Sequence, residues 1–543
     1  MTFKGQILKS ASVIALVTLI SRICGYLRDQ RVALLLGTSP AADAFILAFS
    51  IPNLIRRMTG EGALGASFIP VFAGNLREKP WDATISFVRK TFWNLAIILG
   101  VVAILGAVFS KQVVYVFTLF GGSHIQWNLA ILLNRIIFPC VLFIGLAALV
   151  SAVLNSFHIF ALPSSTSIYF NLVLILCSFG FVYRPIMGLA SPSLRTPAIA
   201  LAAGVLVGSA LQLFVQLPAL YRRGIRLQPE VSFHDPEVRK VGRLMVPAFF
   251  GMGVYQINFF VDRVFATSSR MPTGSITSLY IADRVMQLVL GTYAIALSTA
   301  LLPMLSHQVA AGKLGDMKRA FGFSIRIVSF ITIPAAVGLI LLRGPIIQVL
   351  FQHGHFTSDS TALTSNALLY YSLGLPAFAA IKLITPVFFS TQDTLTPARI
   401  GAYALAANIA LNTIFLLLLY RSLSNGGPAL ASSLAAYFNF ALLFIVFRDR
   451  FGHVDVPGFV ASFAKIVVST LAMAAVAYEC ARHANFASLG HFVGQAALLG
   501  VLIAASTGAY FAVAWLLRCE ELSEFLLILR RGERGAEAAA GGL

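Results

Sequence analysis

Residues 21–31 read SRICGYLRDQR, and this charged run lies inside an otherwise apolar segment from about residue 11 to residue 36. A segment of that length is long enough for an α-helix to cross a bilayer, which takes about 20 residues. Each ionised side chain at the centre of a bilayer costs about 2.5–3.5 kcal/mol. Three arginines and an aspartate in one such helix therefore predict that it serves a polar site inside a membrane protein.

The rest of the chain has the composition of a polytopic membrane protein. Of its 543 residues, 58% are hydrophobic and 11% are charged, and the mean hydropathy is +0.84. A soluble domain is about a quarter charged. The first helix is too long and too charged for a cleaved signal peptide. We expect an all-α integral membrane protein with about 14 transmembrane helices, centred near residues 23, 55, 98, 142, 172, 209, 253, 291, 334, 375, 408, 438, 470 and 504.

The net charge of +19 does not indicate a nucleic-acid partner, because most of the excess lies in short loops, where it sets membrane topology. The alternate loops carry few basic residues, so we expect both termini in the cytoplasm. The five cysteines are scattered without metal-ligand spacing, and we expect no firm metal site. The basic segments lie near residues 4–9, 77–90, 222–243, 313–319, 448–450 and 530–534.

The chain matches itself weakly at an offset of 233 positions (295 − 62). GALGASFIPVF (62–72) falls on IALSTALLPML (295–305), and Pro139 pairs with Pro376 when a few residues of slack are allowed. An offset of six helices preserves orientation, which predicts two parallel lobes and favours an alternating-access transporter. We predict an N-terminal lobe at 1–225, a C-terminal lobe at 226–451, two further helices at 452–520 and a cytoplasmic amphipathic or disordered tail at 521–543.

Basic residues outnumber acidic ones inside the expected helices. Because internal ion pairing cannot neutralise the surplus, it predicts a water-filled site for an anionic guest. A guanidinium binds phosphate through two parallel hydrogen bonds and stays ionised, which favours a phosphorylated substrate. The candidate substrate-binding residues are Arg22, Arg28, Arg56 and Arg284, and the acidic residues expected to orient them are Asp43 and Glu61.

Asp262 lies in the expected seventh helix, and Asn408 and Asn412 form an i,i+4 pair in the eleventh. Two interpretations stay open for these residues. Their oxygens form a possible cation site, or they make interhelical hydrogen bonds, which the sequence favours.

The segments SRICGYLRD, ADAFILAFSIPNLIRRMTGEGALGASFIPVF and YIADRVMQ…ALSTALLPMLS together resemble the MurJ (MviN) family of lipid II flippases. This family belongs to the multidrug/oligosaccharidyl-lipid/polysaccharide (MOP) exporter superfamily. The resemblance implies two lobes and fourteen helices in the bacterial inner membrane, with the last two helices forming a groove for a lipid tail. It implies transport of the undecaprenyl-diphosphate-linked peptidoglycan precursor from the cytoplasmic to the periplasmic leaflet, for cell wall synthesis and cell shape.

The resemblance also implies residue roles. The essential arginines of the family match Arg22, Arg28, Arg56 and Arg284, and its acidic partners match Asp43 and Glu61. A sodium site of some relatives matches Asp262, but its second element, Asn-x-x-x-Asp, here reads Asn408-x-x-x-Asn412.

One carboxylate of that sodium site is therefore missing. We expect no cofactor, and we favour the membrane potential over coupling to Na+ or H+. The expected partners are lipid II and membrane lipids, without nucleic acid, for a protein that functions as a monomer.

Two rival functions remain at this point. The nearer one is a flippase for another polyprenyl-diphosphate-linked glycan, or another exporter of the same superfamily. The remote one is an integral membrane glycosyltransferase, which would need a positioned acid, base or metal. The sequence shows neither clustered acidic residues nor a histidine-based motif at a membrane face, so we expect that the protein is not an enzyme.

The topology prediction is tested with reporter fusions. Fusions after Gly37 and Gly122 should report the periplasm, and fusions near Lys79 and Arg226 the cytoplasm, because the basic loops stay inside. A cytoplasmic signal after Gly37 would contradict the predicted orientation of every helix.

Overall fold

The chain folds into α-helices that form two compact units. The computed structural model describes residues 3–58, 64–118, 125–189, 191–311, 313–391, 393–452, 456–484, 486 and 492–523, and this part of the chain contains no strand. Unit 1 comprises Met1–Phe260 and Thr267–Ser269, and unit 2 comprises Val261–Ala266 and Arg270–Leu543. An all-helical fold suits a bilayer, because a helix satisfies its own backbone hydrogen bonds where no water is present.

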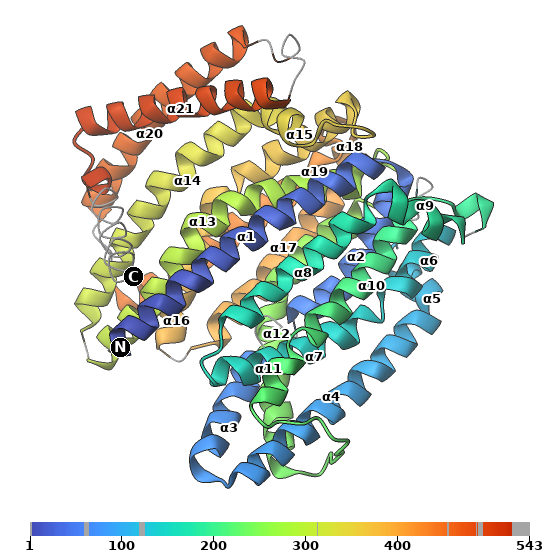
Figure 1. Ribbon diagram of the computed structural model, residues 1–543. Helices are drawn as coiled ribbons and strands as arrows, with labels where there is room; N and C mark the ends of the chain where they lie inside the picture. Colours follow the sequence, from blue (N-terminus) through green and yellow to red (C-terminus); the bar gives the residue numbers. More distant parts are fainter. Residues whose placement is uncertain are drawn as a thin grey trace. The chain divides into compact units, whose positions relative to one another are not determined.

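Unit 1 contains eleven of the described α-helices, one 3₁₀ turn and most of α12. They are α1 (Phe3–Leu36), α2 (Pro40–Met58), α3 (Leu64–Glu78), α4 (Trp81–Val108), α5 (Ser110–Phe117), α6 (Trp127–Ile137), α7 (Cys140–Ser156), α8 (Ala161–Cys177), α9 (Gly180–Gly188), η2 (Pro192–Leu194), α10 (Ala198–Phe214), α11 (Leu217–Arg222) and α12 (Pro236–Phe265). Helix α1 packs along α8 (Figure 1).

Unit 2 contains the end of α12 and the remaining described helices. They are α13 (Ser275–Ala310), α14 (Leu314–Phe351), α15 (Ser358–Leu373), α16 (Leu375–Ser390), α17 (Leu395–Leu418), α18 (Tyr420–Leu423), α19 (Gly426–Phe451), α20 (Val456–His483) and α21 (Phe492–Leu516). Helices α20 and α21, drawn in orange and red in Figure 1, pack against each other and against α14.

Eight described helices are long and apolar enough to cross a membrane, or up to ten when each bent pair is taken as one span. Each of the predicted helix centres falls within a described helix. The chain is therefore a multi-pass membrane protein, and the full count of 14 spans stays a prediction.

Two helix pairs bend sharply within the described spans. In unit 1, α8 and α9 meet with a bend of 72°. In unit 2, α15 and α16 meet at Gly374 with a bend of 44°, and Pro376 is the second residue of α16. The α6–α7 segment, with Pro139 as the residue before α7, instead forms one span, Trp127–Ser156. The internal repeat therefore stays a prediction.

The core of unit 1 is built from aromatic rings on α3, α4 and the end of α7. Phe68 stacks on Phe72 and Phe87 with centroid distances of 5.4 and 5.5 Å, and Phe157 meets Phe72 edge-on at 5.7 Å. In unit 2, the Tyr510 hydroxyl on α21 donates to the Phe330 carbonyl oxygen on α14 at 2.7 Å. That bond ties the C-terminal helix pair to α14.

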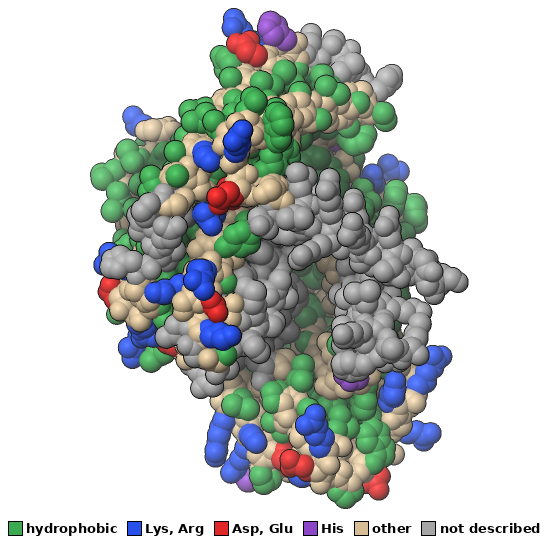
Figure 2. Space-filling view, turned by 90° about the vertical axis from the view of Figure 1, so that its left-hand side faces the viewer, with side chains coloured by type: hydrophobic (Ala, Val, Ile, Leu, Met, Phe, Trp, Pro, Cys, Tyr) green, Lys and Arg blue, Asp and Glu red, His purple; other side chains and the backbone are tan. Residues whose placement is uncertain are grey.

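The outer surfaces of the spans are apolar. Val108, Leu418, Leu471 and Trp515 are large side chains that stay more than half exposed. On the face shown in Figure 2, the described surface is mostly hydrophobic, and lysines and arginines lie in separate groups. Such a surface suits contact with lipid acyl chains.

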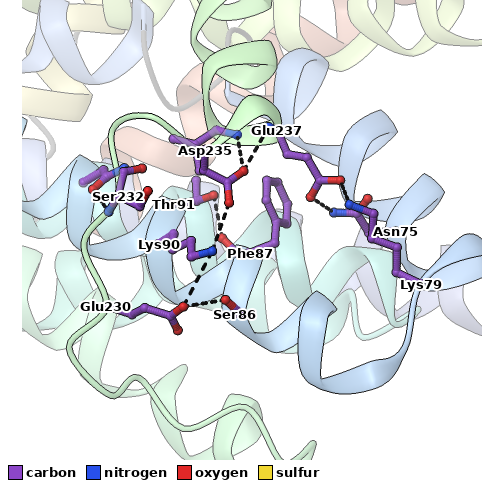
Figure 3. Close-up of polar contacts among 12 residues, drawn as sticks. Asn75, Lys79, Ser86, Phe87, Lys90, Thr91, Glu230, Ser232, Asp235 and Glu237 are labelled. Carbon is purple, nitrogen blue, oxygen red and sulfur yellow. Dashed lines mark hydrogen bonds and ion pairs between the residues drawn. The ribbon is translucent and has the colours of Figure 1, made fainter.

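The segment from residue 226 to residue 235, here called the linker, is fastened to α4 (Figure 3). Lys90 on α4 lies 3.0 Å from an Asp235 carboxylate oxygen and 3.7 Å from one of Glu230. Asn94 donates to the Ser232 carbonyl oxygen at 2.7 Å, and its own amide oxygen accepts from the Ser232 N–H at 3.2 Å. The linker is thus bonded to α4 at three successive points.

The first turn of α12 continues the same attachment. Glu237 accepts hydrogen bonds from Asn75 on α3 and from Lys79, the residue after α3 (Figure 3). These contacts fasten the start of α12 within unit 1, which extends to Phe260. The predicted start of a second lobe at 226 stays a prediction. The predicted segments 452–520 and 521–523 belong to unit 2, and the tail from 524 onward lies outside the described residues.

The attachment changes the pKa of Asp235, a carboxyl of the linker. Burial alone would raise its pKa, but hydrogen bonds from Lys90 and from the backbone N–H groups of Glu237 and Val238 hold the pKa below its usual value. A carboxyl with a lowered folded-state pKa stabilises the fold above its unfolded pKa of about 4, and this contribution is lost as the pH falls through the lowered value.

Lys90→Met tests the attachment. We expect it to lower the free energy of unfolding by about 1 kcal/mol at pH 7, because the ion pairs are partly exposed. The difference from the unmodified protein should shrink below about pH 4 as Asp235 becomes protonated. Thermal unfolding of the detergent-purified protein measures both, with the exposed Lys111→Met as control. Equal losses for the two variants would contradict the assignment.

Candidate functional site

Helix α1 carries the charged run at residues 21–31. It is continuous from Phe3 to Leu36 and ends at Gly37, whose φ of +58° suits a glycine and whose N–H donates to the Ala33 carbonyl oxygen at 2.8 Å. Arg22 is half-buried on this helix, and Arg28 is 8% exposed. The charges therefore lie within a regular helix rather than at a break.

Arg28 is held by two partners on two helices. Its Nε and Nη2 donate to Asp29 Oδ1 at 3.0 and 2.6 Å, and its Nη1 donates to Asn171 Oδ1 on α8 at 2.9 Å. The sequence predicts Arg28 as part of an unpaired surplus, but the structure pairs it with the neighbouring carboxylate. Burial explains the pairing, since a buried guanidinium without a partner is far more costly than a paired one.

Arg31, one turn further along α1, also contacts the end of α8. Its Nε donates to Ser178 Oγ at 3.0 Å, and its guanidinium lies 4.6 Å from the centroid of the Phe179 ring. A cation over an aromatic face is a favourable contact. Two arginines of α1, Arg28 and Arg31, therefore donate hydrogen bonds to α8 and to the residue that follows it.

In unit 2, Arg284 lies on α13 beside an aromatic ring. Its Nη2 donates to the Tyr280 hydroxyl at 3.1 Å, and its guanidinium lies 5.0 Å from that ring's centroid. Arg263 lies 5.3 Å from the same centroid and 3.7 Å from Asp283 Oδ2. Tyr280 therefore contacts two guanidinium groups, and Asp283 contributes a carboxylate to the group.

The remaining predicted residues are described only in part. Asp43 is completely buried in the first turn of α2, and its N–H donates to the Ser39 carbonyl oxygen at 3.0 Å. Arg56 lies on α2 with its side chain outside the described part of the structure, and Glu61 falls wholly outside it. The predicted pairing of acidic residues with these arginines therefore stays a prediction.

Asp262, Asn408 and Asn412 meet in the interior of unit 2, where each is at most 1% exposed. Both asparagines donate through Nδ2 to Asp262 Oδ1 at 3.2 Å. The other carboxylate oxygen accepts from the hydroxyls of Tyr371, at 3.1 Å, and Ser432. Four donors thus surround one carboxylate, which matches the interpretation of interhelical hydrogen bonding.

The described contacts of Asp262 are those of a hydrogen-bonded carboxylate, with two amide and two hydroxyl donors. A hard cation would need several oxygen ligands, and the possible cation site at these residues stays a prediction. Asn412 Oδ1 is the one amide oxygen of the pair that accepts no hydrogen bond from the described residues. The described residues also contain no group of three or more His, Cys, Asp or Glu side chains that could hold a metal ion.

Sequence reasoning missed four residues of these networks: Asn171, Tyr280, Tyr371 and Ser432. Each is a single polar or aromatic residue in an apolar helix, a pattern that is common in membrane helices without any site. Asn171, Tyr371 and Ser432 are distinguished only by their position opposite Arg28 or Asp262, and that position comes from the fold. Tyr280 lies one turn before Arg284 on α13, and this i,i+4 spacing is the signal that could have found it.

Comparison with known proteins places the chain among lipid flippases. A sequence profile of the family described as lipid II flippase MurJ matches residues 32–493. The probable lipid II flippase MurJ of Vibrio cholerae is 37% identical over 454 residues, covering 82% of this chain and 83% of the relative. The lipid II flippase MurJ of Burkholderia cenocepacia is 30% identical over 508 residues, covering 92% and 95%.

Solved structures agree with the sequence matches. A lipid II flippase MurJ in an inward closed conformation is similar with a TM-score of 0.77 at 27% identity, covering 93% of this chain and 98% of that one. A multidrug resistance transporter of the MATE family in the MOP superfamily gives a TM-score of 0.66 at 14% identity, covering 80% and 98%. The second likeness concerns the fold alone.

Replacing Asp262 tests the hydrogen-bonded centre. Asp262→Leu should lower the free energy of unfolding by at least about 3 kcal/mol, because four buried donors lose their acceptor. Asp262→Asn should lower it less, since one acceptor oxygen remains. Thermal unfolding of the purified protein measures the loss, with the exposed Asp359→Leu on α15 as control. An Asp262→Leu protein that unfolds like the control would contradict the described network.

Proposed function

Because the chain belongs to the MurJ lipid II flippase family, we propose that it moves lipid II across the bacterial inner membrane. The cargo is the undecaprenyl-diphosphate-linked peptidoglycan precursor, carried from the cytoplasmic to the periplasmic leaflet for cell wall synthesis. The observation that supports this proposal is Arg28, a buried arginine held in one orientation inside a span of a chain that matches the family over most of its length.

In the proposed mechanism, the arginines bind the diphosphate and no covalent bond is made or broken. Arg22, Arg28, Arg56 and Arg284 supply guanidinium groups, which bind phosphate oxygens through parallel hydrogen bonds. The apolar outer surfaces of the spans leave the prenyl tail in contact with lipid. Alternating access of the site to the two leaflets completes the cycle. The protein acts as a monomer with both termini in the cytoplasm, and it is a transporter rather than an enzyme.

Depletion of this protein in its own host tests the substrate. We expect outward-facing lipid II to disappear while the precursor accumulates on the cytoplasmic side. Unchanged exposure of lipid II, with accumulation of a different polyprenyl-diphosphate-linked glycan, would instead support the nearer rival function. Re-expression of the full chain should restore exposure.

The arginine assignment is tested by complementation of the depleted strain. Alanine at any of the four arginines should abolish growth, because the guest loses a charged ligand. Membrane abundance should stay near normal for Arg22, Arg56 and Arg284, whereas Arg28→Ala also removes a partner of the buried Asp29 and should lower abundance. Arg28→Lys should restore growth only in part, since an ammonium lacks the planar fork. Arg135→Ala, at an exposed arginine of α6, serves as the control and should complement fully. Growth of all four alanine variants would contradict an anion-binding site.

The driving force is proposed to be the membrane potential. An anionic head group moving toward the positive outside gains about 2.3 kcal/mol per charge per 100 mV. The inside-negative potential also favours return of an empty site that holds more arginines than carboxylates. The hydrogen-bonded state of Asp262 and the amide at Asn412 support this choice over sodium coupling.

A flipping assay in whole cells or vesicles separates the two driving forces. Sodium is replaced by choline at fixed potential, and the potential is then collapsed at fixed sodium. We expect flipping to survive the first change and to stop after the second. The opposite pattern would contradict potential-driven transport and identify Asp262, Asn408 and Asn412 as the ion site.

A further inference from the structure

Asn171 lies on α8 opposite the charged run of α1, and it is 5% exposed. Its Oδ1 accepts from Arg28 Nη1 at 2.9 Å, and its Nδ2 donates to the Ser21 carbonyl oxygen at 3.3 Å. One side chain therefore contacts both the guanidinium of Arg28 and the backbone of α1 two turns earlier. This bridge spans 143 residues of sequence.

The bond from Asn171 adds a direction that Asp29 cannot supply. Asp29 is the next residue on the same helix, and it accepts from Nε and Nη2 along one side of the guanidinium. Asn171 approaches from α8 and accepts from Nη1. Because a guanidinium is planar and its N–H groups have fixed directions, hydrogen bonds from two helices determine the orientation of the whole group.

An amide suits this task better than a second carboxylate would. Arg28 already contacts the Asp29 carboxylate, and a second carboxylate at position 171 would add negative charge that repels an anion. An amide oxygen orients the guanidinium without adding charge. An arginine side chain also loses rotamer freedom on binding, and that loss is smaller when the orientation is set beforehand.

Arg31, the next arginine of α1, is also oriented by an uncharged acceptor. Arg31 donates to the Ser178 hydroxyl at 3.0 Å, and Ser178 is seven residues, or about two helical turns, beyond Asn171. Both acceptors are neutral and come from the same side of α8. The α8 segment thus orients arginines of α1 with uncharged oxygens.

We propose that Asn171 is a positioning residue for substrate binding, which sets Arg28 in the orientation that receives the diphosphate of the cargo. The inference rests on the proposed function, since it assumes a diphosphate guest. It names a residue that acts through Arg28 and does not itself touch the substrate.

Equilibrium binding by the full chain in detergent tests the proposal with two probes, undecaprenyl diphosphate and undecaprenyl monophosphate. Asn171→Ala should weaken binding of the diphosphate probe at least about fivefold, the worth of one hydrogen bond of about 1 kcal/mol. The monophosphate probe, with fewer oxygens for the guanidinium to match, should lose less. In a protein that already carries Arg28→Ala, Asn171→Ala should cause little further loss, because its effect passes through Arg28.

Asn171→Asp is a second variant that preserves shape and the acceptor for Arg28 but loses the donor to the Ser21 carbonyl oxygen. It adds negative charge beside the guanidinium, so we expect about a tenfold loss for the diphosphate probe together with a lower unfolding temperature. Asn134→Ala is the matched control, because Asn134 is a buried asparagine of α6 that donates to Ser110 Oγ at 2.9 Å. It should lower the unfolding temperature without changing the ratio of affinities for the two probes.

Three results would overturn the proposal. The first is unchanged diphosphate binding in both Asn171 variants, and the second is an equal loss for the two probes. The third is a loss from Asn171→Ala that adds fully to the loss from Arg28→Ala. If the unmodified protein shows no preference for the diphosphate probe, the proposed function fails and the inference fails with it. A normal preference with unaffected Asn171 variants would refute the inference alone.

Discussion

The cost of placing a charge among apolar helices governs the polar structure of both units. A buried ionised group needs partners, and losing one of them costs several kcal/mol. Arg28 is accordingly bonded to Asp29 and Asn171, and Asp262 accepts from four donors. Partners for a buried charge come from neighbouring helices, so each network also decides which helices pack together. The same hydrogen bonds therefore orient the candidate binding residues and join the helices that pack together.

The helices follow from features that are readable along the chain. Long apolar runs predict spans because lipid leaves the backbone no other partners. The charged residues of α1 are equally visible, since they stand out from an apolar background. What the sequence does not show is the residue opposite each charge. Asn171 has no periodic signal of its own, and its contact with Arg28 depends on the packing of α8 against α1.

The loop before α12 shows a second limit of sequence reasoning. The topology rule counts the basic segment at residues 222–243 only for its positive charge. Its carboxylates instead pair with Lys90, and Glu237 pairs with Lys79. Basic residues that the topology rule counts only as inside markers thus have specific acidic partners. Total charge per loop cannot distinguish a free loop from an attached one, because the distinction depends on which residues face each other.

The two buried centres solve the same electrostatic problem with opposite chemistry. In unit 1, a cation is surrounded by acceptors, one charged and one neutral. In unit 2, an anion is surrounded by neutral donors, two amides and two hydroxyls. An amide serves in both centres, since it offers an acceptor to Arg28 at position 171 and donors to Asp262 at positions 408 and 412. Two ionised carboxylates at 262 and 412 would repel each other, so one of them would need a proton or a cation. An amide at 412 instead donates to Asp262 and adds no charge, so protein donors satisfy the Asp262 carboxylate in the described structure.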